Sequence, residues 1–328
     1  MSALSSKPYC TISVDVDSLD SILRFHGQSP SIAYRANDPI YEKVLPRFLR
    51  LFSEHGVKAT FFVVASDCSS PSKQTMLQRV IDEGHEIANH SLNHAFGFSL
   101  LPRKEKEKDI FESTRIIEEA CGQRPSGFRV PGYDIDEVTI DILDRAGYLY
   151  DSSVYKFFAY PALRKFSYIR SGHILKRDAL KGLASEFLPT LLPPLKAYFP
   201  KRGKFWRAGY GRDILEIPIS VIPFFNLPFN STFLFIFGAR LFDFGFWMTG
   251  KRDLNLNYNF HPADMLDSVR DKIFVKQPGL SVALDTKRRL FHRILGKIEK
   301  RYSFVTLKTF ANTIKRSKGN LQERVGKP

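Results

Sequence analysis

Short apolar runs alternate with amphipathic segments through the first half of the chain. Five apolar runs predict buried strands, at residues 9–16, 59–65, 85–88, 127–130 and 148–150. Four intervening segments carry apolar residues at helical spacing, at residues 40–55, 73–83, 104–121 and 136–146. A glycine directly follows each of these four segments, as is common where a helix ends. Strands that alternate with helices in this way predict βαβ units, a parallel sheet and an α/β fold.

The middle of the chain differs, because residues 184–250 are rich in Phe and Pro. An uncharged stretch of 23 residues, 217–239, is long enough to span a bilayer, but its three prolines disfavour a transmembrane helix. We expect instead a buried strand with loops, or a surface segment that dips into lipid. The aromatic side chains in and after this stretch form either an exposed apolar patch, a lipid-tail groove or part of the core. They are Phe233, Phe235, Phe237, Phe242, Phe244, Phe246 and Trp247.

The composition is that of a folded protein, with 43% hydrophobic and 25% charged residues. It excludes a disordered chain, a collagen-like chain and a small disulfide-held scaffold. The formal net charge is 49 − 34 = +15, and residues 271–328 hold 15 Lys or Arg against 4 Asp or Glu. We predict a basic helical extension and tail there, which either is solvated or contacts an anionic membrane. No nucleic-acid-binding motif accompanies this charge, so nucleic acid is not an expected partner.

Cysteine usage and the start of the chain bear on the compartment. Cys10, Cys68 and Cys121 are an odd number of cysteines at no metal-ligand spacing, which suits reduced thiols in the cytoplasm. Residues 1–13 contain one lysine and no long apolar run, so no secretory leader is expected. We therefore expect a cytoplasmic protein, with peripheral contact to the inner membrane face as a further hypothesis.

Carboxylates and histidines follow two of the predicted strands. Asp15 and Asp17 are two residues apart and therefore point to one side of the first strand. A metal ion beside them would offset their repulsion, although a solvated loop would also accommodate them. His90 and His94 have a spacing that puts both imidazoles on one face of a helical turn. With Asp17 they offer three metal ligands, and a catalytic zinc keeps its fourth position for water.

Two further polar residues follow predicted strands. Arg129 precedes Pro131 and Gly132, which force a sharp turn and expose backbone N–H groups. Its guanidinium can hold a carboxylate through two parallel hydrogen bonds, although an arginine at a turn is often structural. His261 follows an alternating, strand-like segment and precedes Pro262. Because imidazole titrates near neutral pH, a histidine there either serves as a general acid or is structural.

Several segments resemble the motifs of the polysaccharide deacetylase family, carbohydrate esterase family 4, in the family's order and approximate spacing. They are residues 13–17, 56–62, 90–94, 129–133, 150–153 and 260–262. The resemblance covers roughly residues 9–155 and 215–267. Val16 separates two aspartates that are adjacent in the family's common form, so the chain resembles a branch with an Asp-x-Asp motif.

The resemblance implies a distorted (β/α)7 barrel with a metal ion at the C-terminal mouth of its strands. Residues 1–270 would form this catalytic barrel. Within it, residues 156–214 would be an unmatched insertion and residues 215–250 a hydrophobic segment. The basic extension, residues 271–328, would follow.

The resemblance also implies a role for each candidate residue. Asp17, His90 and His94 would bind the metal ion, with zinc expected first and cobalt, nickel or iron as alternatives. Asp15 would be the general base and His261 the general acid.

Four more residues would assist this chemistry. Arg129 would orient the general base and tune its acidity, and Asp151 would support the general acid. Backbone N–H groups at Gly132 and Tyr133 would bind the oxyanion.

These roles imply a metal-dependent hydrolase that removes the N-acetyl group of an amino sugar. The Phe-rich middle and the basic C-terminus favour a lipid-linked saccharide or a sugar nucleotide precursor at the inner membrane face. A deformylase, or another hydrolase of non-peptide amides, is the alternative within the same fold. An inactive barrel that binds glycan or lipid is the alternative of another class.

Overall fold

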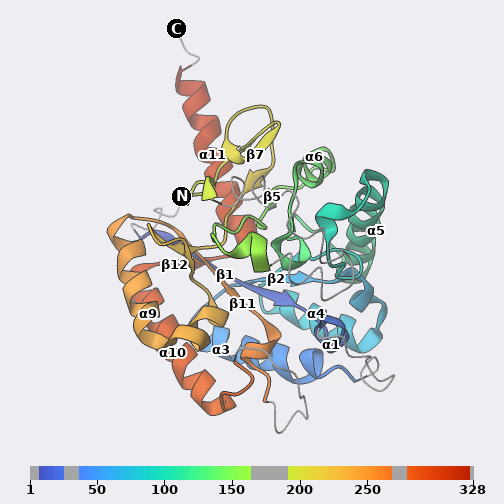
Figure 1. The fold of residues 1–328 in the computed structure, drawn as a ribbon. Coiled ribbons are helices and arrows are strands. Elements are labelled where there is room, and N and C mark those ends of the chain that lie inside the picture. The colour runs from blue at the N-terminus through green and yellow to red at the C-terminus, as the bar shows by residue number, and fades with distance from the viewer. Residues whose placement is uncertain (1–6, 26–36, 164–190, 268–278, 326–328) are drawn as a thin grey trace.

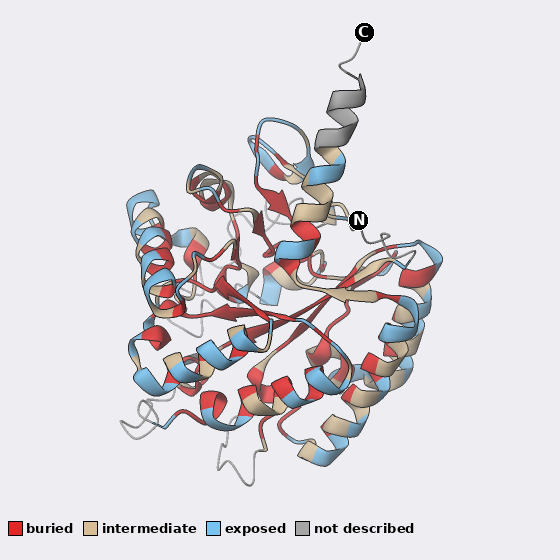
Figure 2. Ribbon diagram, turned by 180° about the vertical axis from the view of Figure 1, so that it is seen from behind, coloured by how far each residue is buried: buried red, intermediate tan, exposed pale blue. Residues whose placement is uncertain are grey.

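The computed structural model describes residues 7–25, 37–163, 191–267 and 279–325. Residues 164–190 of the predicted insertion, and 268–278 around the predicted domain boundary, lie outside this part. Within it, eight strands form one sheet, and helices pack around the sheet (Figure 1). Figure 2 shows that most strands of the sheet are buried, whereas the outer sides of the helices are exposed.

The main sheet has the strand order β11-β1-β2-β3-β4-β5-β8, and β12 also pairs with β1. All of these pairs are parallel. The strands are β1 (Tyr9–Val16), β2 (Thr60–Val63), β3 (Glu86–Asn89), β4 (Gly127–Phe128), β5 (Tyr150–Asp151), β8 (Leu215–Glu216), β11 (Leu256–Phe260) and β12 (Ser303–Val305). The two ends of the sheet approach each other, because Ser220 after β8 donates its N–H to the Asn257 carbonyl of β11 at 3.1 Å. The sheet therefore curls, and the predicted distorted (β/α)7 barrel is confirmed.

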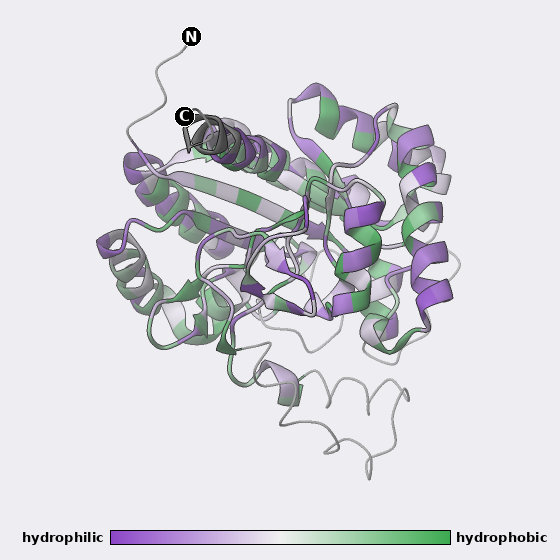
Figure 3. Cartoon of the chain, turned by 90° about the horizontal axis from the view of Figure 1, so that it is seen from above, coloured by the Kyte–Doolittle hydropathy of each residue, from purple (hydrophilic) through white to green (hydrophobic). Residues whose placement is uncertain are grey.

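Helices connect the strands on the outside of the sheet. The longer ones are α1 (Leu19–Phe25), α3 (Leu45–Glu54), α4 (Pro71–Asp82), α5 (Arg103–Cys121), α6 (Glu137–Arg145), α9 (Ser231–Lys251), α10 (Leu284–Arg301) and α11 (Leu307–Val325). The short turns are η1 (Ile40–Val44), η2 (Ala65–Ser69), η3 (Phe98–Leu100), η4 (Pro131–Tyr133) and η6 (Pro262–Asp264). Many of the helices carry hydrophilic residues on their outer sides (Figure 3).

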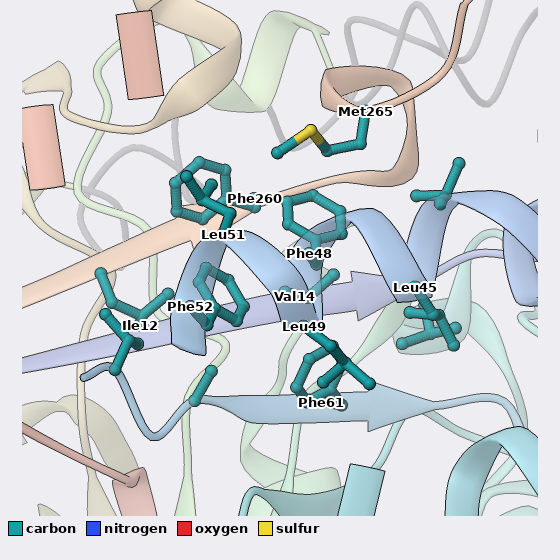
Figure 4. Packing of buried hydrophobic residues seen from close by; sticks show 14 of the residues in the cluster. Ile12, Val14, Leu45, Phe48, Leu49, Leu51, Phe52, Phe61, Phe260 and Met265 are labelled. Atoms are coloured by element: carbon teal, nitrogen blue, oxygen red, sulfur yellow. The ribbon is translucent and has the colours of Figure 1, made fainter. Parts of the chain in front are cut away.

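The largest part of the core lies between α3 and the strands β1, β2 and β11 (Figure 4). Apolar residues of α3 recur at helical spacing, so one side of the helix faces the sheet. The rings of Phe48 and Phe52 lie 5.6 Å and 6.0 Å from that of Phe260, and Phe52 lies 6.2 Å from Phe61. This packing fixes β11 beside β1.

The predicted C-terminal extension, residues 271–328, contributes directly to the barrel. Strand β12 pairs with β1, with Tyr9 opposite Ser303. On α10, Phe291 and Leu295 are fully buried in the main core cluster. The charge pattern concealed this because the apolar residues occupy one side of each basic helix.

The predicted strand with loops between residues 217 and 239 is correct only for its first half. Two short hairpins occur in the middle of the chain, β6 (Pro200–Lys201) with β7 (Lys204–Ala208), and β9 (Val221–Ile222) with β10 (Leu227–Pro228). After the last proline, Asn230 caps the 21-residue helix α9 by accepting the Phe233 N–H. In the described part of the chain, α9 is long and apolar enough to cross a membrane, by length and composition only.

Candidate metal centre and active site

Three side chains that could bind a metal ion meet at the C-terminal ends of β1 and β3. Ligand atoms of Asp17, His90 and His94 all lie within 4.8 Å of one another. Asp17 Oδ1 is 3.5 Å from His90 Nε2 and 3.1 Å from His94 Nε2. The structure thus brings the three predicted ligands together.

The two histidines reach this place from a loop, so the predicted helical turn is wrong. Ser91 and His94 have left-handed φ angles of 73° and 53°. The Asn89 side chain accepts the Ser91 N–H at 2.8 Å, and the Ser91 hydroxyl accepts the His94 N–H at 3.1 Å. These bonds stabilise a backbone that few residues adopt, and they aim both imidazoles at Asp17.

The donor set fits a divalent metal ion. His90 Nδ1 lies 2.8 Å from the Arg129 carbonyl oxygen; donating to that oxygen, it leaves the lone pair of Nε2 facing Asp17. Asp17 Oδ1 and His94 Nδ1 have no well-formed hydrogen bond among the described residues. Burial favours the neutral acid, but the imidazoles of His94 and His90 outweigh burial and lower the pKa of Asp17. Two imidazoles and one ionised carboxylate are the ligands of many catalytic zinc sites.

Asp15 lies beside this cluster, buried and surrounded by hydrogen-bond donors. It accepts from Arg129 Nη1 at 2.6 Å, from Asn259 Nδ2 at 3.0 Å and from the Tyr133 hydroxyl at 3.3 Å. Burial alone would raise the pKa of Asp15, but the Arg129 guanidinium, together with the neighbouring imidazoles of His90 and His261, lowers it below the ordinary value. Asp15 is therefore an ionised carboxylate at neutral pH.

Arg129 is fully buried and joins four elements of the barrel. Besides Asp15, its Nη1 donates to Ser13 Oγ at 3.0 Å and to Asn259 Oδ1 at 2.9 Å. Its Nε and Nη2 donate to the Ser152 carbonyl at 2.8 Å and the Ser152 hydroxyl at 2.9 Å. The predicted contact with Asp15 is present, but through one nitrogen rather than two parallel bonds.

Asn259 is a site residue that the sequence reasoning missed. Its Oδ1 accepts from Ser13 at 2.9 Å and from Arg129, and its Nδ2 donates to Asp15 and, at 2.6 Å, to the Tyr133 hydroxyl. It is two residues before His261, and therefore points to the same side of β11. The two-residue spacing between Asn259 and His261 was the sequence signal that could have identified Asn259 as a site residue.

His261 lies across the cavity from the metal cluster. Its Nε2 is 3.7 Å from Asp15 Oδ2 and 3.4 Å from the Tyr133 hydroxyl. Its backbone N–H donates to Asp264 Oδ2 at 2.7 Å, which holds the start of η6. The predicted acid and the predicted base thus face one space.

Two adjoining cavities open at this place. One, of about 150 Å³, is lined by both aspartates, both metal-site histidines and His261. The other, of about 300 Å³, is mostly apolar and contains several aromatic rings, among them Tyr155, Phe157, Tyr160 and Phe233, so we call it the aromatic cavity. They share Phe96, Gly132, Tyr133 and His261. A group held at the metal cluster can therefore extend into an aromatic cavity.

Comparison with known sequences shows which family the chain is similar to. A sequence model of the polysaccharide deacetylases matches residues 29–150. Over these residues the chain is similar to the polysaccharide deacetylases. The peptidoglycan deacetylase of Helicobacter pylori is 26% identical over 110 residues, 34% of this chain and 36% of that protein. The chitooligosaccharide deacetylase of Sinorhizobium fredii is 30% identical over 106 residues, 32% of this chain and 48% of that protein. The matches thus span about a third to a half of these relatives.

Solved structures of this family extend the likeness to the rest of the fold. A crystal structure from Mycobacterium smegmatis, described as a polysaccharide deacetylase, has a TM-score of 0.59 and 17% identity, over 96% of this chain and 93% of that one. A crystal structure from Pseudomonas aeruginosa, described in the same way, has a TM-score of 0.55 and 16% identity, over 93% of this chain and 89% of that one. At these identities the likeness shows the fold alone.

Two roles that the polysaccharide deacetylase motifs implied differ in the structure. Asp151 accepts the N–H and the hydroxyl of Ser153, at 2.9 Å and 2.8 Å, and pairs in register with Glu216. Asp151 has no hydrogen bond to His261 among the described residues, because its carboxylate is held by Ser153 and lies beside Glu216. Asp151 and Glu216 form a buried carboxyl pair, and burial raises the pKa of both groups.

The implied oxyanion site is likewise altered. The Tyr133 N–H donates to the Val130 carbonyl at 2.9 Å, so it is already used within the turn. The Tyr133 side chain instead brings its hydroxyl between Asp15 and His261. Gly132, with φ of 62°, lines the cavity.

Proposed function

We propose that this chain is a metal-dependent hydrolase that removes an N-acyl group, in first place acetyl, from an amino sugar. The observation that carries the proposal is one cavity that holds Asp17, His90 and His94 beside the Asp15–His261 pair. The names of the relatives, a peptidoglycan deacetylase and a chitooligosaccharide deacetylase, support the substrate class.

The three ligands would hold the metal ion, with zinc suited best and cobalt, nickel or iron as alternatives. Such an ion would polarise the amide carbonyl and make the attacking water more acidic. Asp15 would accept the proton of that water, since it is ionised and lies beside the cluster. Arg129 and Asn259 would keep Asp15 in place through their hydrogen bonds.

The departing amine needs a proton, because it cannot leave as an anion at neutral pH. His261 would donate that proton from the opposite side of the cavity. We assign the contact with the developing oxyanion to the Gly132 N–H rather than to the Tyr133 N–H, because the latter donates to the Val130 carbonyl. The products would be a carboxylic acid and a free amino group.

We further propose that the saccharide is linked to lipid and that the protein works at the cytoplasmic side of the membrane. The aromatic cavity that shares His261 with the catalytic cavity supports this substrate, because it offers an apolar environment beyond the amide.

Two variants and a substrate panel test the proposed function. Asp15→Asn should keep its metal and lose turnover, whereas His90→Ala should lose metal. His292→Ala, on the surface of α10, should keep both. Metal content and product masses would be measured with N-acetyl and N-formyl amino sugars, free and polyprenyl-linked. Full metal content in His90→Ala would refute the ligand set. If the metal-loaded protein binds the saccharides but does not hydrolyse them, an inactive barrel is favoured. If formate is the product, a deformylase is favoured.

A further inference from the structure

We propose that α9 and the β9–β10 turn form a surface that docks on an anionic lipid bilayer. This docking face consists of Phe224, Phe225, Phe237, Phe244 and Trp247, whose exposed fractions are 71%, 54%, 52%, 40% and 55%. It lies at the outer edge of the fold, where α9 runs beside α10 (Figure 1). Clusters of large exposed apolar residues in a folded protein commonly mark an interaction surface.

Helix α9 is apolar on two opposite sides, which an ordinary surface helix is not. One side is in the core, with Leu234 and Phe242 buried. On the other side, after the break at Gly238, the exposed residues Arg240, Phe244, Trp247 and Lys251 recur every three or four positions. The side that faces away from the protein thus combines aromatic and basic residues, as in helices that lie in a membrane interface.

The β9–β10 turn adds two rings to the same face. Phe224 has a left-handed φ of 71°, a conformation unfavourable for a bulky residue, and it is the most exposed Phe of the docking face. The ring centre of Phe225 lies 5.8 Å from that of Phe244. The Phe244 ring in turn stacks on Trp247, with 6.2 Å between the ring centres. The turn and the helix therefore form one continuous surface rather than separate exposed residues.

The charges on this face select a negatively charged surface. The exposed charged residues on and directly after α9 are Arg240, Lys251, Arg252 and Asp253, three positive and one negative. The half-buried Asp243 of α9 is already paired with Arg293 and Lys297 of α10. Basic residues beside Phe and Trp bind anionic lipid headgroups while the rings enter the headgroup boundary.

The docking face is connected to the catalytic cavity through the first turns of α9. Phe233 lines the aromatic cavity, and its ring stacks on Phe237 of the docking face at 5.5 Å. Docking would therefore bring the aromatic cavity to the bilayer surface. This inference rests on the proposed function, because it names the surface from which a lipid-linked saccharide would be taken.

Tryptophan fluorescence offers a direct test, since the chain has two tryptophans and Trp206 is remote from the docking face in β7. In Trp206→Phe, Trp247 is the sole reporter. Its emission should shift to the blue with phosphatidylcholine–phosphatidylglycerol vesicles, and brominated lipids should quench it. In Trp247→Phe, emission from Trp206 should not respond. Absence of both changes in Trp206→Phe would overturn the inference.

Vesicle sedimentation tests the individual rings. Phe224→Ser/Phe225→Ser should weaken binding at least about tenfold, because two rings no longer leave water. Phe111→Ser is the matched control, because Phe111 on α5 is 52% exposed and lies outside the docking face. Circular dichroism and thermal melting would establish that both variants fold. Unchanged vesicle binding in the double variant would overturn the inference. So would a wild-type dimer that the double variant converts to monomers, because the docking face would then be a contact between two copies of the chain.

The two proposals fail differently. A protein that hydrolyses soluble N-acetyl oligosaccharides but does not bind vesicles would retain the proposed function and lose the docking face. A protein that binds vesicles through Trp247 but hydrolyses no amino-sugar amide, even with metal bound, would retain the docking face and lose the proposed function.

Discussion

Replacing Arg129 by Met should destabilise the protein strongly, because it leaves a buried carboxylate without its cation. The Arg129 side chain is completely buried, and Asp15 is 5% exposed in the side chain and 2.6 Å away. Breaking a buried ion pair from one side typically costs about 3–5 kcal/mol. Met fills a similar volume, so the loss of the charge and of the hydrogen bonds to Ser13, Ser152 and Asn259 dominates the effect.

The pH dependence of this loss has a definite sign. In the wild type the pKa of Asp15 is lowered, so its ionisation stabilises the fold above its ordinary pKa of about 4 and ceases to do so as the pH falls. Without Arg129, burial dominates and the pKa of Asp15 rises above its unfolded value. The stability difference between wild type and variant should therefore grow as the pH increases from about 4 to 7.

Urea unfolding in the presence of a chelator measures this effect without contribution from metal. Asp15→Asn should relieve much of the penalty, so the double variant should be more stable than the sum of the two single changes implies. Arg115→Met is the matched control: its partner Glu119 is 60% exposed, and the loss should stay within about 0.5 kcal/mol. An Arg129→Met loss below about 1 kcal/mol, or no relief by Asp15→Asn, would refute the reasoning.

Two further predictions concern the fold away from the site. Burial lowers the pKa of His85 to about 4, and its Nδ1 accepts the Ala59 N–H at 2.9 Å. Stability should fall as the pH drops from about 6.5 to 4, since only the unfolded chain takes up the proton there, and His85→Gln should flatten this part of the profile. Gly127→Ala should cost about 1–3 kcal/mol in thermal or urea unfolding, because a Cβ would lie 1.9 Å from Tyr150 Cζ. A Cβ added at Gly296 would have its nearest neighbour, His55 Cε1, at 3.9 Å, so it would not clash. Gly296→Ala should therefore stabilise the protein by about 0.5–1 kcal/mol through α10, and a lower stability of this variant would contradict this account.

The elements that the sequence predicts well are those with local signals. The first five strands and the helices between them follow hydrophobic periodicity, which depends on neighbours a few residues apart. The helix α9 was missed because the three prolines were weighed over the whole apolar stretch, although the last of them, Pro228, precedes the Asn230 cap. Residues 217–239 contain both a hairpin and the start of a helix, so the composition of the whole stretch described neither element.

The candidate site was predictable in its residue types but less so in its contacts. The triad of Asp17, His90 and His94 comes together although its loop is not helical, because two left-handed residues replace the helical turn. Asp151 was misplaced because its partner is set by strand order, which puts β5 beside β8. A motif fixes where a side chain leaves its strand, whereas the neighbouring strand fixes what that side chain meets.

The meeting of Asp15 and His261 shows this dependence most directly. Ser13 of β1 lies opposite Asn259 of β11 in the parallel register. Two residues further along each strand, the same side carries Asp15 and His261. A shift of one residue in this register would turn Asn259 and His261 to the other side of the sheet and remove both from Asp15. The packing of Phe48 and Phe52 against Phe260 holds β11 in this register. It is therefore a condition for pairing the proposed acid, His261, with the proposed base, Asp15.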